Sequence, residues 1–419
     1  MPKSKKYSFL DPIHGSIELD TGVSEDKLIL DLIETPEFQR LRRIRQLGFS
    51  YMTFYGAESS RFVHSIGTCE IARKILNHLS SLGNEVEEHR ACLLASALLH
   101  DVGHGPFSHS SEPSFNFEHE DWTIKNILGK TSINQVLSSY HSRLPSQVAE
   151  VLQEKYAPSW VSRLVSSQLD CDRADYLLRD SFQTGTKYGV FQLDRIIRSL
   201  ELVHTSKKQE LVITEKGLNA VEDYLFARYS MYLQVYHHRK TLSADALFCG
   251  LISRARDLVE AGQKLPLDDS LKKWLLDPKE PDTKNKMSNK MTLSDFWQVD
   301  DSTVLHHLKL WSVDSKDGIL KDLSQRLLNR RLFKTVKLQN LKLTQLKKIV
   351  SKIGSERTKY YCMVKECREF PYQDRKKPIL VRDNGKVVEL SKASTIAKTL
   401  MNKDKELDVE WVFFPAEYQ

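Results

Sequence analysis

Apolar residues recur at three- and four-residue spacing along most of the chain, and no long stretch alternates between apolar and polar positions. This periodicity is typical of helices that pack against one another, so the chain is predicted to be mainly α-helical. Short alternating runs at residues 7–19 and 201–214 predict two small β-hairpins. Helices are expected at residues 27–33, 36–47, in several pieces over 63–128, and at 146–155, 160–181, 216–260, 293–297 and 303–333.

The pattern of apolar and polar residues changes from mainly helical to partly strand-like after about residue 352. Residues 360–367 and 409–414 have the pattern of strands, and residues 378–390 have that of a hairpin with Asp-Asn-Gly as its turn. A last helix is expected at residues 393–401. We therefore predict a large helical domain over residues 1–352 and a small α+β region over residues 353–419. Residues 278–290 are polar and rich in Lys, Asp and Pro, which predicts a mobile loop.

The composition is that of an ordinary water-soluble protein, with 40% hydrophobic and 28% charged residues among 419. No apolar run approaches the roughly 18 residues that a membrane span needs. The basic residues 1–6 are not followed by the apolar run of a signal peptide. The six cysteines are scattered without the spacing of a disulfide framework or a zinc site. These features predict a cytoplasmic protein that does not bind a membrane.

The charge distribution allows a polyanionic partner without demanding one. The net charge is +7, and residues 323–355 contain many Lys and Arg but no Asp or Glu. A basic stretch of this kind is either a solvated face or a surface that contacts polyphosphate or single-stranded nucleic acid. Both interpretations stay open from the sequence.

The strongest chemical signal is a histidine–aspartate pair at the end of an apolar helix. Residues 91–99 are rich in Ala and Leu, and His100 and Asp101 follow directly. Burying two ionisable side chains there is unfavourable unless a metal ion compensates them. His64, at the start of a second helical pattern, and one of the four aspartates between residues 170 and 180 would complete a four-ligand site. A lone histidine on an apolar face is more often a core residue, so the prediction depends on the whole set.

At these residues the chain resembles the HD-domain phosphohydrolases, and within them it is similar to the deoxynucleoside triphosphate (dNTP) triphosphohydrolases. The resemblance implies an HD-type helical bundle, with its central motifs at about residues 60–182. It also implies hydrolysis of a dNTP to a deoxynucleoside and inorganic triphosphate. The matching motifs are Asp-Pro-Ile-His-Gly at residues 11–15 and the segments 34–41, 46–48, 61–67, 100–109, 172–180, 236–239 and 330–334.

By this resemblance, His64, His100, Asp101 and Asp172 bind one divalent metal ion, and Asp170 is the competing carboxylate. Two carboxylates neutralise a divalent ion and still leave positions for water and a phosphate oxygen. Mn, Fe, Mg, Zn and Ni all suit such ligands, so the identity of the metal stays open. A second Mg²⁺ would accompany the triphosphate.

The resemblance also assigns the residues around the metal. His109 would protonate the leaving 5′ oxygen, and Glu112 stands where the family often has an aspartate that orients this histidine. Arginines would clamp the triphosphate, and two tyrosines would crowd the 2′ position of the sugar and so favour deoxyribose. The expected catalytic residues are His104, His109, Glu112 and His119, and the expected substrate-binding residues are Gln46, Leu47, Arg61, Arg173, Tyr176, Asp180, Arg228 and Tyr236.

A further set of positions matches those at which the family binds activating nucleotides between subunits. The resemblance thus implies a nucleotide activator and a homotetramer built as a dimer of dimers. Two other functions stay open: hydrolysis of another nucleotide phosphate ester, and nucleic-acid binding by a protein whose HD site is vestigial. The biological role, either control of the nucleotide pool or antiviral defence, is open as well. The expected activator-binding residues are Gln39, Arg42, His238, Arg239, Arg330 and Lys334.

Overall fold

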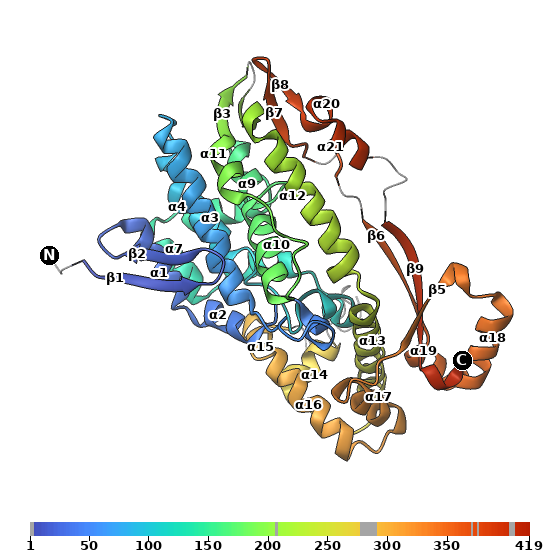
Figure 1. Ribbon diagram of the computed structural model, residues 1–419. Coiled ribbons are helices and arrows are strands. Elements are labelled where there is room, and N and C mark those ends of the chain that lie inside the picture. The colour runs from blue at the N-terminus through green and yellow to red at the C-terminus, as the bar shows by residue number, and fades with distance from the viewer. Residues whose placement is uncertain (1–3, 206–207, 277–290, 370–371, 375–376, 402–406) are drawn as a thin grey trace.

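The computed structural model describes residues 4–205, 208–276, 291–369, 372–374, 377–401 and 407–419 (Figure 1). Over these residues the protein is mainly helical, which confirms the predicted fold class. Three small sheets accompany the helices. The mobile loop predicted at residues 278–290 lies outside the described residues.

The first half of the chain forms a bundle around one long helix. Helix α3 (Arg61–Ser81) packs against both α4 (Glu87–Leu99) and α10 (Cys171–Gln183), and most of its side chains are buried. Because α3 is covered on several sides, its polar residues His64 and Arg61 lie inside the protein and need partners there. The neighbouring elements are β1 (Lys6–Asp11), β2 (Gly15–Asp20), α1 (Ser24–Ile33), α2 (Pro36–Gln39), α5 (Glu112–Phe115), α6 (His119–Leu128), α7 (Ser132–Tyr140), α8 (Leu144–Leu152), α9 (Ser159–Val165), α11 (Leu193–Ser199) and α12 (Leu218–Met231).

A second hydrophobic core surrounds α13 (Arg239–Glu260) and contains the fully buried Trp274, Phe296 and Trp311. Figure 1 shows its helices α14 to α17, in yellow and orange, below the first bundle. This core supports the loop between α4 and α5, since Phe107 and Phe115 both belong to it. Its other helices are α14 (Asp269–Leu276), α15 (Leu293–Trp297), α16 (Asp301–Asp314), α17 (Gly318–Leu328), α18 (Leu343–Ile353) and α19 (Ser355–Tyr361).

The sheets bring distant segments together. The N-terminal hairpin pairs β1 with β2, and the predicted hairpins at residues 201–214 and 378–390 are also present. The hairpin at residues 378–390 joins the hairpin at residues 201–214 through a parallel pairing of β4 with β7. In a separate sheet, the last strand, β9, lies between β5 and β6. Strands from both sides of residue 352 therefore share sheets, and the domain boundary predicted there stays a prediction. The remaining elements are β3 (Leu200–His204), β4 (Gln209–Thr214), β5 (Lys334–Lys337), β6 (Met363–Glu369), β7 (Leu380–Asp383), β8 (Lys386–Glu389), β9 (Leu407–Phe414), α20 (Leu390–Ala393) and α21 (Thr395–Leu400).

Several predicted helices are shorter than expected. The helix predicted at residues 36–47 is α-helical to Gln39 and continues as a 3₁₀ helix over Arg40–Arg43; it ends there because the backbone near Ile44 pairs with that near Ser59 and Arg61. The helix predicted at residues 160–181 is interrupted where the Asp170 carboxylate accepts the backbone N–H of Arg173 and starts α10. A π-helical turn at Tyr232–Tyr236 separates α12 from α13 within the predicted helix 216–260. The predicted helix 303–333 divides into α16 and α17, and residues 360–361 end α19 instead of starting a strand.

Candidate metal-centred active site

Three predicted metal ligands, His64, His100 and Asp101, form one cluster whose ligand atoms lie within 4.8 Å of one another, and Asp172 lies beside both histidines. His64 lies one turn inside α3, His100 and Asp101 follow α4, and Asp172 is the second residue of α10. The Nε2 atoms of the two histidines are 3.3 Å apart. His64 Nε2 lies 3.5 Å from Asp101 Oδ2 and 3.1 Å from Asp172 Oδ1. His100 Nε2 lies 3.4 Å from Asp101 Oδ1 and 3.6 Å from Asp172 Oδ1.

This geometry fits a single divalent ion. Ligand atoms bound at about 2.0–2.2 Å from one ion lie about 3 Å from one another, which is close to the separations in the cluster. Both imidazoles also have their other nitrogen engaged: His64 Nδ1 bonds to Asp175 at 2.7 Å, and His100 Nδ1 donates to the carbonyl of Ala97 at 2.8 Å. The Nε2 atoms, which lie beside Asp172, are therefore the nitrogens left to bind a metal, and an ion bound there would replace any proton that they carry.

The charges in the cluster also suit a cation. Burial opposes ionisation of Asp101, but the neighbouring Arg61 holds the pKa of its carboxyl well below the usual value. Burial likewise opposes ionisation of Asp172, whose pKa is nonetheless lowered by hydrogen bonds from His100 and His64. Both carboxylates are thus anionic. They provide the two negative charges that balance a divalent ion.

Asp170, the competing carboxylate, is used for another purpose. Its side chain accepts the backbone N–H groups of Ser167 at 2.6 Å and of Arg173 at 2.7 Å, and so caps the start of α10. It also pairs with the Arg173 guanidinium at 2.5 Å. Because Asp170 is occupied in this way, Asp172 is the carboxylate that α10 offers to the cluster.

Asp175 is a site residue to which the sequence assigned no role. It is fully buried, and its Oδ2 lies 2.7 Å from His64 Nδ1. A carboxylate on the far nitrogen of a ligating histidine fixes both the tautomer and the orientation of the ring. The only signal in the sequence is spacing, because Asp175 follows Asp172 by three residues and so lies near it on the same helix.

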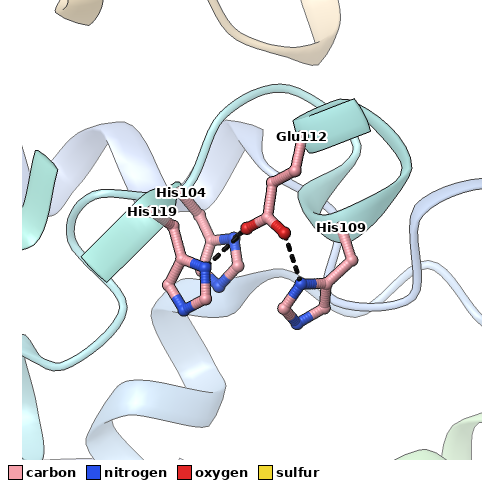
Figure 2. A group of neighbouring side chains, drawn as sticks. All are labelled: His104, His109, Glu112 and His119. Carbon is pink, nitrogen blue, oxygen red and sulfur yellow. Dashed lines mark hydrogen bonds and ion pairs between the residues drawn. The ribbon is translucent and has the colours of Figure 1, made fainter. Parts of the chain in front are cut away.

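A second cluster lies beside the first, at the turn between α4 and α6 (Figure 2). Glu112 bridges two histidines: its Oε1 lies 2.5 Å from His119 Nδ1 and its Oε2 lies 3.1 Å from His109 Nδ1. Burial opposes ionisation of Glu112, yet the hydrogen bonds from His109 and His119 lower its pKa. Glutamate is therefore long enough to orient His109, and it orients His119 at the same time. The Nε2 atoms of both rings stay available to a substrate.

His104 completes this second cluster, in which one nitrogen or oxygen atom of each of the four side chains lies within 4.8 Å of the others. Its ring stacks on that of His119, with centroids 3.8 Å apart and planes inclined by 14°. Because the nitrogen lone pairs of parallel rings run parallel, these two histidines are poorly placed to bind one ion together. Burial and the nearby Arg61 hold the pKa of His104 well below its usual value, so this imidazole is neutral. We therefore interpret the second cluster as an acid–base and phosphate-contacting group.

Both clusters open into one cavity of about 910 Å³. Most of the predicted substrate-binding residues line this cavity. Among them, Tyr176 and Tyr236 meet edge to face, with ring centroids 5.9 Å apart. Arg228 does not line it; its guanidinium lies over the ring of Tyr232, which does. The predicted substrate-binding residues that line the cavity are Gln46, Leu47, Arg61, Arg173, Tyr176, Asp180 and Tyr236.

The turn that carries His104 and His109 is held by residues from distant parts of the chain. Phe107 and Ser108 both have positive φ angles, 58° and 54°, a strained conformation for residues other than glycine. Asp301, at the start of α16, accepts the backbone N–H of Phe107 at 2.7 Å. Buried Arg40 donates to the carbonyl of His104 at 2.7 Å. The sequence assigned no role to either residue: Asp301 lies far from every motif, and Arg40 lies within the motif at residues 34–41 without a function of its own.

The six predicted activator-binding residues lie outside this cavity. Arg42 donates to Gln39 at 2.8 Å and covers the ring of Phe62, while Arg330 donates to the carbonyl of Met52 at 2.5 Å. Lys334 contacts the side chain of Gln419. His238 caps the start of α13, and Arg239 is the first residue of that helix. Their role stays a prediction.

Comparisons with known proteins match the segment that holds both clusters to one protein family. Residues 61–180 match the family model of the HD domain, and residues 191–269 match that of the HD associated region. The chain is 39% identical over 413 residues to the uncharacterised protein YwfO of Bacillus subtilis, covering 96% of this chain and 90% of that one. Among the described residues, no helix is both long and apolar enough to pass through a lipid bilayer.

Two further similar proteins have names that state an activity. The chain is 27% identical over 386 residues to the deoxynucleoside triphosphate triphosphohydrolase SAMHD1 homolog of Dictyostelium discoideum, covering 86% of this chain and 72% of that one. The crystal structure of a phosphohydrolase from Bacteroides thetaiotaomicron aligns with a TM-score of 0.82 at 27% identity, over 98% of this chain and all of that one.

Proposed function

The chain belongs to the HD-domain phosphohydrolases that carry the HD associated region, and on that premise we propose that it is a metal-dependent dNTP triphosphohydrolase. In the proposed reaction, water attacks the α-phosphorus of a dNTP, and the bond from that phosphorus to the 5′ oxygen breaks. The products are a deoxynucleoside and inorganic triphosphate. The observation that carries the proposal is the single cavity that joins residues of the metal cluster, the histidines held by Glu112 and the polar side chains of Gln46 and Asp180.

The metal end of the cavity would hold the reacting phosphate. His64, His100, Asp101 and Asp172 would bind the divalent ion, which supplies a water of lowered pKa and polarises the phosphoryl oxygen. Arg61 and Arg173 line the same region and present planar guanidinium groups that suit phosphate. Arg61 also donates to Ser108 at 2.6 Å, and this bond fixes the Arg61 guanidinium relative to the turn that carries His104 and His109.

His109 is the residue that we propose as the general acid. It is exposed at the cavity, with 66% of its side chain accessible, and Glu112 engages its Nδ1. Its Nε2 is thereby left to deliver a proton to the 5′ oxygen as that oxygen takes the electron pair of the breaking P–O bond. His119, oriented by the same carboxylate, would contact the phosphate beside it.

The part of the cavity lined by Gln46, Tyr176, Asp180 and Tyr236 suits a deoxyribose. Tyr236 donates to Asp180 Oδ2 at 3.0 Å, which leaves Asp180 Oδ1 buried with no partner among the described residues. Gln46 Oε1 is buried and unpartnered in the same sense, and both side chains line the cavity. Buried acceptors of this kind favour a ligand that brings a donor, as the 3′-hydroxyl of a deoxynucleotide would. Tyr176 and Tyr236 line the same cavity and would crowd a 2′-hydroxyl there.

Product analysis tests this proposal. The full-length protein, loaded with Mn²⁺ or Mg²⁺, is incubated with each dNTP and each NTP, and the products are separated by anion-exchange chromatography. We expect inorganic triphosphate in equal amount to the deoxynucleoside, and much less product from NTPs. Release of orthophosphate or pyrophosphate alone would refute the proposal and would point to hydrolysis of another nucleotide ester. The matched inactive control is the double variant His100→Ala/Asp101→Ala.

We further propose that a nucleotide activator binds between subunits of a homotetramer. The support is the basic character of the predicted activator-binding residues and their position outside the catalytic cavity. Light scattering with and without dNTP mixtures, alongside turnover, tests this: a tetramer that forms and becomes active with nucleotide supports it. A monomer of constant activity would refute it. Paired dNTPs in the turnover assay identify the activator.

A further inference from the structure

The turn of the N-terminal hairpin reaches behind the metal cluster. Asp11 ends β1 and accepts the backbone N–H groups of Ile13 at 2.8 Å and of His14 at 3.0 Å. These bonds fix the turn and direct the His14 side chain into the bundle, where only 2% of it is accessible. The hairpin precedes the HD motifs in sequence, yet its turn contacts their interior.

Two bonds join this turn to α10. His14 Nε2 lies 2.6 Å from Asp175 Oδ1, and Arg179 Nη1 donates to Asp11 Oδ2 at 2.8 Å. Arg179 also donates to both oxygens of Asp175, at 2.8 Å each. This two-pronged pairing with a guanidinium favours the charged carboxylate, to which His14 can donate. Asp175 Oδ2 in turn bonds to the metal ligand His64.

Helix α3 leaves space for this network at Gly67, one turn after His64. A Cβ atom at Gly67 would lie 2.0 Å from Asp175 Oδ1 and 2.4 Å from Arg179 Nη2. No side chain larger than hydrogen fits without displacing the carboxylate. The close approach of α3 to Asp175 therefore requires this glycine, which indicates that the position of the carboxylate is tightly constrained.

We propose that His14 is a positioning residue of the metal site: it holds Asp175, and Asp175 holds the ring of metal ligand His64. His14 is the only side chain of the hairpin turn that bonds to Asp175 among the described residues. Without it, Oδ1 keeps the Arg179 bond but loses a donor on its other side, and the carboxylate gains freedom to turn away from His64. The N-terminal hairpin is then part of the metal-binding unit. This inference needs only metal binding at the cluster and is independent of the nucleotide specificity proposed above.

Metal affinity tests the proposal without reference to turnover. The full-length protein is stripped of metal with a chelator, and Mn²⁺ binding is measured by electron paramagnetic resonance of the free ion. Loss of an outer partner of a metal ligand weakens binding by about 10- to 100-fold. Because Arg179 still holds Asp175, we expect His14→Ala and His14→Phe to weaken Mn²⁺ binding by about 10-fold, at the low end of that range. His14→Gln, which keeps a donor, should recover part of the loss.

A matched control separates positioning from general destabilisation. His78 also lies on α3 and makes a comparable histidine bond, from Nε2 to the carbonyl of Leu200 at 3.0 Å, far from Asp175 in sequence. We expect His78→Ala to lower the melting temperature but to bind Mn²⁺ as the wild type does. Wild-type Mn²⁺ affinity in both His14→Ala and His14→Phe would overturn the proposal. An equal loss of affinity in His78→Ala would overturn it as well.

Discussion

Glu112 offers the sharpest perturbation of the proposed chemistry, because one carboxylate orients two histidines. In Glu112→Gln the amide oxygen can accept from only one of the two Nδ1 atoms, and the amide N–H₂ faces the other. That second ring must adopt the opposite tautomer or rotate away. His109 is the ring more free to move, since 66% of its side chain is accessible against 15% for His119.

The size of the effect follows from what a positioned general acid contributes. General acid–base catalysis supplies about 10²- to 10⁴-fold in rate, so we expect Glu112→Gln to lower kcat by about 100-fold. Glu112→Asp, one methylene shorter, would keep a carboxylate but reach only one histidine; we expect a loss of about 10-fold. KM should stay within about twofold of the wild-type value, since Glu112 itself contacts no substrate in the proposed arrangement.

The assay is triphosphate release at saturating Mn²⁺, with metal content measured in parallel by mass spectrometry. Glu112 does not belong to the metal cluster, so both variants should retain full metal content. Wild-type kcat in Glu112→Gln would refute the role given to the Glu112–histidine cluster. Loss of metal from that variant would show instead that the cluster itself binds an ion.

Three other perturbations test separate parts of the account. The double variant His100→Ala/Asp101→Ala should lose bound metal and turnover while its circular dichroism stays helical; bound metal at wild-type content would contradict the site. Burial raises the pKa of Asp180 to about 7, so between pH 4 and 7 the unfolded chain ionises this group while the folded protein keeps its proton. The free energy of unfolding should therefore fall as pH rises through that window, and Asp180→Asn should gain up to about 4 kcal/mol relative to wild type, measured by urea unfolding at each pH. A pH-independent difference would contradict this. Asp301→Ala frees the Phe107 backbone N–H and should lower kcat by about 10-fold with metal content unchanged, as expected for a buried hydrogen bond of about 1.5 kcal/mol.

Local signals in the sequence were sufficient for the helical fold class and for the segments that carry the metal cluster. The pair His100-Asp101 is visible because two ionisable residues end an otherwise apolar helix. The hairpins at residues 7–19, 201–214 and 378–390 are visible because a period of two is a local property. Each of these features depends on a few neighbouring residues.

Features that depend on tertiary partners could not be predicted in this way. The helix at residues 36–47 has good helical periodicity, but pairing with residues 59–61 ends it early. Asp175 resembles the other acids of α10 until the position of His64 is known. Asp301 acts on a turn nearly two hundred residues earlier in the chain, and no local pattern records that contact.

Anomalous diffraction from crystals grown with Mn²⁺ tests the central claim most directly. The account predicts one strong peak within bonding distance of the Nε2 atoms of His64 and His100 and of a carboxylate oxygen from each of Asp101 and Asp172. A map with no peak among these four side chains, or with its only peak between Glu112 and its histidines, would contradict it.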